Sequence, residues 1–326
     1  MAPLLDVREL TVELPTPGGW VQPVQQVSLT LGPGESLGLV GESGSGKTML
    51  ALALVGLLPQ GARRAGQAWL SRARSGDPID LVKLGEQGLR HIRGREIGFV
   101  FQEPMTALNP VMRIGAQISE AVLAHQPRLG KFEVRRRVHD ALEYARVPNL
   151  ELRARQFPHQ LSGGLRQRAM IAMALAAHPR LLVADEPTTA LDVTVQKEIL
   201  ALLAKLRRDL GLALLFITHD LGVVAQVADR VAVMYAGRIV ETGPAAELLR
   251  HPRHPYTEGL LKALPQLDSH GVEPIPGMIP ALDALPSGCA FEPRCAYRQE
   301  PCSAGMPELR RAGPDHSARC ILVAEP

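Results

Sequence analysis

Apolar and polar residues alternate in blocks along the first 250 positions of the chain. Short runs that are almost wholly apolar have the length of buried strands, and longer runs with apolar residues three or four apart follow the period of amphipathic helices. We expect strands over 24–31, 36–40, 97–101, 181–184, 212–217 and 231–235. We expect helices over 49–58, 133–146 and 193–210, and a mostly helical region over about 103–175. Strands that alternate with helices predict an α/β fold with a parallel sheet.

The pattern changes near residue 250. Hydrophobic periodicity fades and prolines become frequent, at positions 252, 255, 265, 274, 276, 280 and 286. Proline fixes φ and removes a backbone donor, so a proline-rich stretch favours loops over long helices and central strands. We therefore predict a first domain over 1–252, with a helical subdomain at about 103–175, and a loop-rich extension over 253–326.

Composition excludes some classes of protein. Of the 326 residues, 46% are hydrophobic and 21% are charged, which supplies a sizeable core and argues against disorder. Aromatic residues make up only 4%, so stacking platforms for single-stranded nucleic acid are not expected. The net charge is +3, and apart from short clusters such as Arg135-Arg136-Arg137 the basic residues are scattered. We interpret that cluster as a solvated face and expect no nucleic-acid partner.

The sequence contains no obvious membrane span. Its longest uncharged apolar run, 49–59, is shorter than the roughly 20 residues that cross a bilayer. The first residues lack the basic and apolar segments of a secretion signal. We therefore expect a cytoplasmic protein that reaches a membrane only through partners.

A glycine-rich turn follows the expected strand 36–40. Residues 41–48, GESGSGKT, fit the phosphate-loop pattern G-x-x-x-x-G-K-[ST] and precede an apolar helix. In such a loop backbone N–H groups converge on phosphate oxygens, and the helix adds its positive N-terminus. We expect Lys47 to reach the β- and γ-phosphates of ATP and Thr48 to bind Mg²⁺. The expected nucleotide-binding residues here are Ser43, Gly44, Ser45, Gly46, Lys47, Thr48 and Met49.

Two acids end a second apolar strand. Asp185 and Glu186 follow the run 181–184, so Asp185 stands at the strand tip and can face the Mg²⁺. Glu186 can polarise the attacking water as a general base. Many strands end in acids, but a position downstream of a phosphate loop favours the catalytic interpretation.

A second candidate anion site begins another helix. Ser162, Gly163 and Gly164 precede the apolar run 170–177, and a serine with two glycines at a helix start exposes N–H groups to an anion. One chain needs only one phosphate loop for its ATP, so a second anion site suggests a dimer in which each chain completes the other's pocket. An ordinary capped helix is the alternative, and these residues alone do not decide between the two.

Taken in chain order, these motifs resemble the ATP-binding-cassette (ABC) ATPase family over residues 1 to about 250. The resemblance implies a RecA-like parallel-sheet core with an antiparallel β region and an inserted helical subdomain. It implies that Gln102 senses Mg²⁺ and the membrane partner, that Asp192 lies at a dimer interface, and that His219 contacts the γ-phosphate. It also implies ATP hydrolysis in which Lys47, Gln102, Glu186 and His219 take part.

Two positions depart from the family pattern. Leu165 follows the Ser162-Gly163-Gly164 group where many members have glutamine, but the helix-start atoms are kept. Members also stack an aromatic residue of the first β region on adenine. Trp20 is the best candidate for that role, and surface packing is the alternative.

Three further segments resemble the ATP-binding subunits of dipeptide/oligopeptide importers. They are residues 101–110 (FQEPMTALNP), residues 254–257 (HPYT) and the triplet Pro293-Arg294-Cys295 in the extension. The resemblance implies a second, homologous ATPase subunit, two transmembrane permeases and an external solute-binding protein. It places the chain at the cytoplasmic face of the bacterial inner membrane.

Three alternatives to peptide import differ in how well the motifs support them. Import of nickel or another small solute by the same machine stays open. A soluble ABC ATPase of DNA repair would carry long coiled coils, and one of translation would carry two cassettes, neither of which the sequence shows. A redox regulator with a vestigial ATPase is disfavoured because Lys47, Asp185, Glu186 and His219 are all present.

All four cysteines lie in the extension, at positions 289, 295, 302 and 320. In a reducing compartment such a group favours a metal site over disulfides. The spacing C-x5-C-x6-C-x17-C is wider than usual for structural zinc, and four cysteines also suit a [4Fe–4S] cluster. Spacing alone leaves both open. The resemblance favours the iron–sulfur cluster, with zinc as the alternative, and we interpret it as a structural staple rather than a redox sensor.

Overall fold

The computed structural model describes residues 2–72, 76–264 and 274–323, so residues 265–273 and 324–326 of the predicted extension lie outside the described residues. The chain forms two compact units. The first combines Met1–Leu31, Ser36–Lys83 and Ile217–Pro326, and the second combines Gly32–Glu35 with Leu84–Phe216. Each contains helices packed on strands, which confirms the α/β class.

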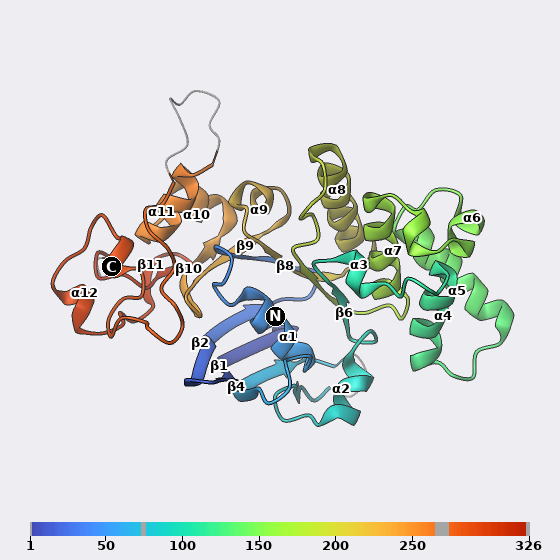
Figure 1. The fold of residues 1–326 in the computed structure, drawn as a ribbon, viewed down its shortest axis with the longest axis horizontal. Coiled ribbons are helices and arrows are strands. Elements are labelled where there is room, and N and C mark those ends of the chain that lie inside the picture. The colour runs from blue at the N-terminus through green and yellow to red at the C-terminus, as the bar shows by residue number, and fades with distance from the viewer. Residues whose placement is uncertain (1, 73–75, 265–273, 324–326) are drawn as a thin grey trace. The chain divides into compact units, whose positions relative to one another are not determined.

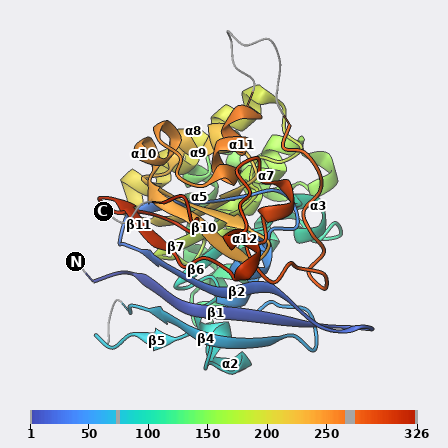
Figure 2. The ribbon, with the colours of Figure 1, turned by 90° about the vertical axis from the view of Figure 1, so that its left-hand side faces the viewer.

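An antiparallel sheet begins the first unit. Its strands lie in the order β2-β1-β4-β5 and can be followed in Figure 2. Apolar residues on the inner face, such as Leu5 and Leu10, are fully buried. Strand β2 begins directly after the turn, at Gly19, which has φ 126°. The strand bounds are β1 (Leu5–Thr16), β2 (Gly19–Leu31), β4 (Arg63–Leu70) and β5 (Ile79–Asp80).

A second group of strands in the first unit carries the phosphate loop. Strand β3 is wholly buried and runs parallel to β9, and β9 pairs with β10 antiparallel. Burial on both faces is typical of parallel strands and explains the continuous apolar runs in the sequence. The bounds are β3 (Ser36–Val40), α1 (Lys47–Val55), α9 (Leu221–Val227), β9 (Arg230–Tyr235), β10 (Arg238–Pro244), α10 (Ala245–Arg250) and α11 (Pro255–Lys262).

The C-terminal extension is loop-rich, as expected, yet it adds two strands to this sheet. Strand β12 (His316–Ala318) pairs with β10, and β11 (Arg310–Gly313) pairs with β12. Its other described elements are α11, the 3₁₀ turn η2 (Glu292–Arg294) and α12 (Pro301–Ala304). Elements of three or four residues leave no periodicity to detect in a sequence, which is why these strands were not expected.

The second unit contains a parallel pair, β6 and β7, with β8 beside β7. Between β6 and β7 lies the helical region that the sequence predicts. Figure 1 shows α4, α5, α6 and α7 gathered there. The bounds are α2 (Glu86–Ile92), β6 (Ile97–Val100), α3 (Pro104–Ala107), α4 (Ile114–His125), α5 (Lys131–Tyr144), α6 (Leu150–Arg155), η1 (Pro158–Gln160), α7 (Gly163–Leu175), β7 (Leu181–Asp185), α8 (Val193–Leu210) and β8 (Ala213–Thr218).

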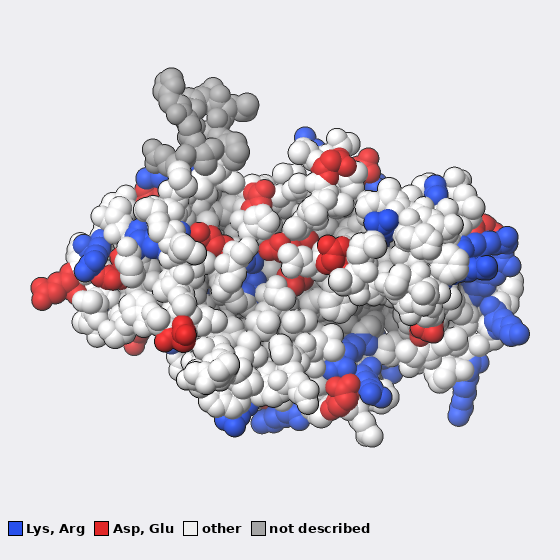
Figure 3. All heavy atoms as spheres, in the orientation of Figure 1, with Lys and Arg blue, Asp and Glu red and all other residues white. Residues whose placement is uncertain are grey.

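The arginine cluster 135–137 lies on α5. Figure 3 shows basic side chains gathered over α5 and α6. Arg135 pairs with Glu151 at 2.8 Å, and Arg136 pairs with Glu133 at 2.7 Å. Exposed ion pairs of this kind contribute little stability, and their geometry agrees with the interpretation of a solvated helix face.

Most expected elements appear within two or three residues of their predicted bounds. Helix α8 has the predicted bounds, whereas α1 ends at Val55, three residues before the predicted end. Gly56 adopts φ 65° and its N–H caps the helix, so the turn is made before Pro59 is reached. Among the described residues, no helix combines the length and apolarity needed to cross a bilayer.

Candidate functional site

The loop of residues 41–48 connects β3 to α1 in the first unit, and its backbone admits only glycine at two positions. A Cβ atom on Gly41 would lie 2.1 Å from the carbonyl oxygen of Met234. Gly46 has φ 104°, and a Cβ atom there would lie 2.1 Å from the carbonyl oxygen of Pro23. The fold therefore requires both glycines of the phosphate-loop pattern.

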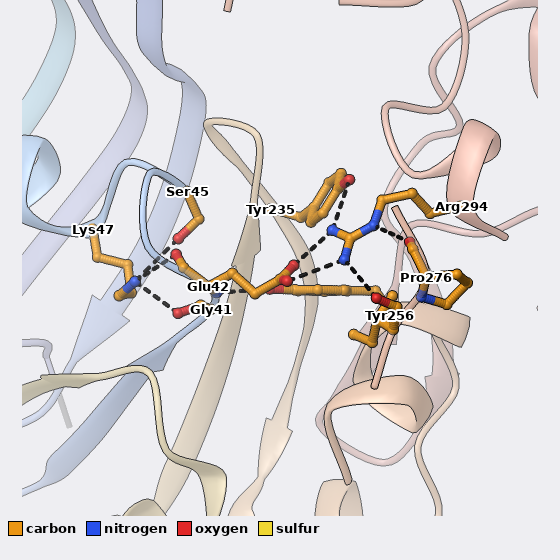
Figure 4. Close-up of polar contacts among 9 residues, drawn as sticks. Gly41, Glu42, Ser45, Lys47, Tyr235, Tyr256, Pro276 and Arg294 are labelled. Carbon is orange, nitrogen blue, oxygen red and sulfur yellow. Dashed lines mark hydrogen bonds and ion pairs between the residues drawn. The ribbon is translucent and has the colours of Figure 1, made fainter. Parts of the chain in front are cut away.

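Lys47 begins α1 and its side chain turns back over the loop. Its Nζ donates to the carbonyl oxygens of Gly41 (2.7 Å) and Glu42 (2.9 Å) and to Ser45 Oγ (3.2 Å), as Figure 4 shows. The lysine is only 4% exposed. Lys47, Thr48 and Met49 form the first turn of α1, where N–H groups and the helix dipole favour an anion.

His219 lies at the same site as the loop. It follows β8 directly and is exposed, and Asp220 caps α9 through the N–H groups of Gly222 and Val223. His219, Ser43 and Gly44 line one open hollow of about 710 Å³, together with residues 277–282 of the extension. The structure thus brings the phosphate loop together with His219, the predicted contact to the γ-phosphate, within the first unit.

Asp185 and Glu186 lie in the second unit, at the end of β7. Asp185 is 2% exposed. Glu186 adopts φ 46°, a backbone conformation that is uncommon for a residue with a side chain and clusters at functional sites. Its Oε2 accepts a hydrogen bond from Gln102 Nε2 (3.2 Å) and another from Thr189 Oγ1 (2.8 Å). The predicted general base and the predicted sensor glutamine are therefore neighbours.

The other predicted residues of the second unit stand at helix starts. Ser162 is the N-cap of α7, and its Oγ accepts from the N–H of Leu165 at 3.4 Å. Gly163 and Gly164 form the first turn of that helix, and Gly163 is exposed. Asp192 caps α8, accepting from Thr194 and Val195. Sequence reasoning thus located both helix starts correctly, and their capping is observed.

Trp20 lies at the start of β2 and is 45% exposed. The guanidinium of Arg63 lies over its ring, 3.9 Å from the centroid. A cation–π contact of this kind suits the surface-packing alternative as well as a stacking role. Adenine stacking by Trp20 stays a prediction.

The four cysteines come together in the first unit. All are free thiols, and the N–H of Cys289 donates to the carbonyl oxygen of Cys302 at 2.8 Å. One small cavity is lined by Cys289, Cys295, Cys302 and Cys320. Burial, with a smaller contribution from the neighbouring thiols, raises the pKa of Cys289 to about 11.

These thiols do not form a ready-made metal site. Among the residues that the structure describes, no three Cys, His, Asp or Glu side chains are arranged to hold a metal ion. Free thiols pack as small apolar groups, so packing within the chain does not arrange the four sulfur atoms as ligands around one point. The cysteines gather as predicted, and the metal itself stays a prediction.

Sequence reasoning missed several residues around the site. Thr189 lies three positions after Glu186, and its hydroxyl donates to the Glu186 carboxylate. This short spacing could have suggested the contact from the sequence. The Arg294 guanidinium donates to the carboxylate of the loop residue Glu42, and the Tyr256 hydroxyl accepts from the N–H of Glu42. Glu42 and Arg294 are 252 residues apart, so no local pattern could have paired them.

Comparison with known families gives two matches along the chain. Residues 24–189 match the family described as ABC transporter. Residues 240–302 match the oligopeptide/dipeptide transporter C-terminal region. The first match includes the phosphate loop and Glu186, and the second includes Tyr256, Arg294, Cys289, Cys295 and Cys302.

Individual proteins are similar to this chain over nearly its whole length. A protein of Brucella ovis named as a peptide import ATP-binding protein is 48% identical over 335 residues, covering 99% of this chain and 98% of its own. A Brucella abortus protein with the same kind of name is 47% identical over 321 residues, covering 98% of this chain and 95% of its own.

Solved structures share the fold. A dimeric ATP-binding cassette with ADP and phosphate bound is similar with a TM-score of 0.65 and 27% identity, covering 74% of this chain and 98% of that one. The protein cbiO1 of Clostridium perfringens, part of an ABC transporter complex, has a TM-score of 0.62 and 28% identity, covering 77% and 92%.

Proposed function

The chain belongs to the ABC transporter family, and on that basis we propose that it hydrolyses ATP to drive the import of dipeptides or oligopeptides through partner permeases. The observation that carries the proposal is the 48% identity to a peptide import ATP-binding protein over 99% of the chain, because this length includes the extension as well as the ATPase motifs. The match of residues 240–302 to the oligopeptide/dipeptide transporter region supports the same substrate class.

Within this function the loop residues from Ser43 to Met49 bind the phosphates, and Lys47 supplies the countercharge. Thr48, Gln102 and Asp185 are our candidate Mg²⁺ ligands, because hydroxyl, amide and carboxylate oxygens are hard donors of the kind that Mg²⁺ prefers. The ion would neutralise charge on the β- and γ-phosphates. Trp20 is our candidate for the adenine contact.

Glu186 is our candidate for the general base that activates the attacking water. Its carboxylate is oriented by the hydrogen bonds from Gln102 and Thr189, so it can accept a proton from the attacking water. His219 is our candidate for the γ-phosphate contact, since it shares a hollow with Ser43 and Gly44.

We propose that a second, homologous ATPase subunit pairs with this chain. Ser162, Gly163, Gly164 and Asp192 would complete the partner's ATP pocket rather than this chain's own. A dimeric cassette among the similar structures supports pairing, and the exposed Gly163 in the first turn of α7 suits contact with an anion from outside the chain. Two permeases, fed by an external solute-binding protein, would hold the pair at the cytoplasmic face of the inner membrane.

We further propose that the four cysteines hold a [4Fe–4S] cluster, with zinc as the alternative. Four thiols around one cavity match the donor set of such a cluster, which holds its thiolates farther apart than one tetrahedral zinc ion does. When bound, the cluster would cross-link the segments that carry Cys289, Cys302 and Cys320 and so contribute folding free energy.

Reconstitution of the assembled transporter tests the main proposal. With the permeases and the solute-binding protein in proteoliposomes, labelled dipeptide should accumulate only with ATP. Lys47→Ala should abolish both ATP binding and uptake, because the polyphosphate loses its main countercharge. Lys205→Ala, at an exposed lysine of α8, is the matched control and should change neither. ATP hydrolysis that responds to nickel and not to peptides would reject the substrate class, and unchanged ATP affinity in Lys47→Ala would reject the phosphate-loop assignment.

A further inference from the structure

The C-terminal extension contacts the phosphate loop at Glu42. Glu42 is the second residue of the loop, and its side chain points away from Lys47 and toward Arg294 (Figure 4). Arg294 Nη1 donates to Glu42 Oε2 at 2.7 Å, and Nη2 donates to Oε1 at 3.1 Å. Two parallel N–H···O bonds between a guanidinium and a carboxylate form one of the stronger polar contacts in proteins.

Arg294 itself is fixed in place by its surroundings. It lies in the 3₁₀ turn Glu292–Arg294, and its side chain is 4% exposed against 32% for Glu42. Its Nε donates to the carbonyl oxygen of Pro276 at 2.9 Å, and Nη1 also donates to the hydroxyl of Tyr235 at 3.4 Å. A guanidinium with its donors used in this way has one preferred position, which in turn fixes the Glu42 carboxylate.

Tyr256 holds the backbone of the same loop residue. The N–H of Glu42 donates to the Tyr256 hydroxyl at 2.7 Å. Tyr256 is fully buried on α11, and its ring packs against Tyr235 and Phe291 with centroids 4.6 and 5.4 Å away. Burial raises the pKa of Tyr256, so the hydroxyl stays protonated and neutral. The loop is thus held from two elements of the extension.

The extension also borders the hollow at the phosphate loop. Residues 277–282 line the hollow that contains Ser43, Gly44 and His219. They follow Ile275 and Pro276, whose carbonyl oxygens accept hydrogen bonds from Arg294. One guanidinium therefore fixes both the loop and the segment that faces it.

A carboxylate beside a polyphosphate creates an electrostatic problem. ATP carries several negative charges, and an uncompensated Glu42 would repel them in a partly buried site where screening is weak. Arg294 cancels that charge at hydrogen-bond distance. A loop held in its binding conformation also loses less conformational entropy when the nucleotide binds.

We propose that Arg294 and Tyr256 are positioning residues for ATP, which hold Glu42 and neutralise it so that the phosphate loop can accept the polyphosphate. The inference rests on the proposed ATPase function and gives the extension a role in it. Both residues lie within 240–302, the region that matches the oligopeptide/dipeptide transporter family, and Arg294 directly precedes Cys295. The ATP site of this chain therefore depends on residues outside 24–189, the range that matches the ABC transporter family.

The test measures the dissociation constant of Mg-ATP for the purified full-length chain. Arg294→Ala should weaken binding roughly tenfold, since an unpaired charge is left near the phosphates. Glu42→Gln alone should bind ATP at least as tightly as the wild type, and adding it to Arg294→Ala should restore most of the lost affinity. Tyr256→Phe, which keeps the ring but removes the acceptor of the Glu42 N–H, should weaken binding a few-fold with little change in Tm.

The matched control is Arg298→Ala, an exposed arginine of the same segment that pairs with Glu292 and should leave ATP affinity unchanged. If Arg294→Ala binds ATP normally while Lys47→Ala does not, the inference is wrong and the ATPase function stands. If Arg294→Ala loses affinity together with Tm, and Glu42→Gln does not restore it, Arg294 is only structural and the inference is again wrong. Normal binding by Lys47→Ala would instead reject the proposed function.

Discussion

The carboxylate of Glu186 receives hydrogen bonds from two side chains, Gln102 at 3.2 Å and Thr189 at 2.8 Å. Both hydrogen bonds end on the same carboxylate oxygen, Oε2, and they hold the side chain in one orientation. The residue is 8% exposed and adopts a left-handed backbone conformation. Backbone strain at a buried acid is a typical feature of a functional site.

Glu186→Gln should bind ATP normally and hydrolyse it very slowly. The amide keeps the size of the side chain but cannot accept a proton, and loss of a general base typically costs ~10²–10⁴ in rate. The measurement is single-turnover ATP hydrolysis in the assembled transporter. Glu198→Gln, at an exposed carboxylate of α8 paired with Arg168, is the control. Turnover within a few-fold of the wild type would remove Glu186 from this role.

At the scale of elements, the start of α7 distinguishes two adjacent glycines. A Cβ atom on Gly163 would meet only Leu191 Cδ2, at 3.7 Å, so this chain has room for a side chain there. A Cβ atom on Gly164 would lie 2.7 Å from Val195 Cγ1, so even alanine requires a shift. The surface at Gly163 can therefore contact a partner subunit, whereas Gly164 is required for the packing of α7 against Val195.

A large side chain at Gly163, for example Gly163→Phe, should leave ATP binding to this chain intact but block hydrolysis at the partner's pocket. Gly164→Ala should instead lower the Tm of the isolated chain, because overpacking costs about 1–3 kcal/mol. Nucleotide trapping in each subunit of the assembled pair would separate the two effects. Loss of this chain's own ATP affinity in Gly163→Phe, with the partner's site still active, would contradict the shared-site arrangement.

Strand β10 anchors the extension through Glu241. This carboxylate is fully buried and accepts from His316 Nε2 (2.7 Å) and from the N–H groups of Arg253 (2.7 Å) and His254 (2.9 Å). It joins β12, β10 and the start of α11. One acid on β10 therefore accepts from three donors in two other segments.

Glu241→Leu should destabilise the extension by about 3–5 kcal/mol, since three donors, two of them buried, lose their acceptor. Limited proteolysis should then cleave after residue 250 while residues 1–250 stay protected. Glu247→Gln, at an exposed carboxylate of α10, is the control. A proteolysis pattern like that of the wild type would show that Glu241 does not anchor the extension.

At the scale of the whole molecule, the extension is tied both to the phosphate loop and to its own cysteines. Arg294 contacts Glu42 and is adjacent in sequence to Cys295. The segment that the proposed cluster would order is thus the segment that positions Arg294. Few long apolar elements support it, since α12 has four residues and β12 has three.

Protein purified without oxygen should be brown and contain about four irons per chain, as a four-cysteine cluster requires. Cys302→Ser should remove the visible absorption band and make residues 285–323 sensitive to protease. Metal analysis beside the absorption spectrum is the deciding measurement, with Ser303→Ala as a control at the neighbouring exposed position. One zinc per chain without a visible band would reject the iron–sulfur proposal, and paired thiols without metal would reject both.

The sequence by itself determined the α/β class, the bounds of elements such as α8, and the order of the nucleotide motifs. These features are local: an apolar run of five residues makes β3, and a glycine-rich turn between a strand and a helix makes the loop. Periodicity and turn chemistry act over a few residues, so they can be detected along the chain.

Only the tertiary structure decided which distant residues meet. Arg294 joins Glu42 across 252 positions, and Gln102 joins Glu186 across 84. Strand β12, three residues long, is stable only because it pairs with β10. Such contacts depend on how the chain folds back on itself, and a charge or a short strand gives the same local pattern whether or not its partner is near. The link between the extension and the phosphate loop is therefore a property of the folded chain.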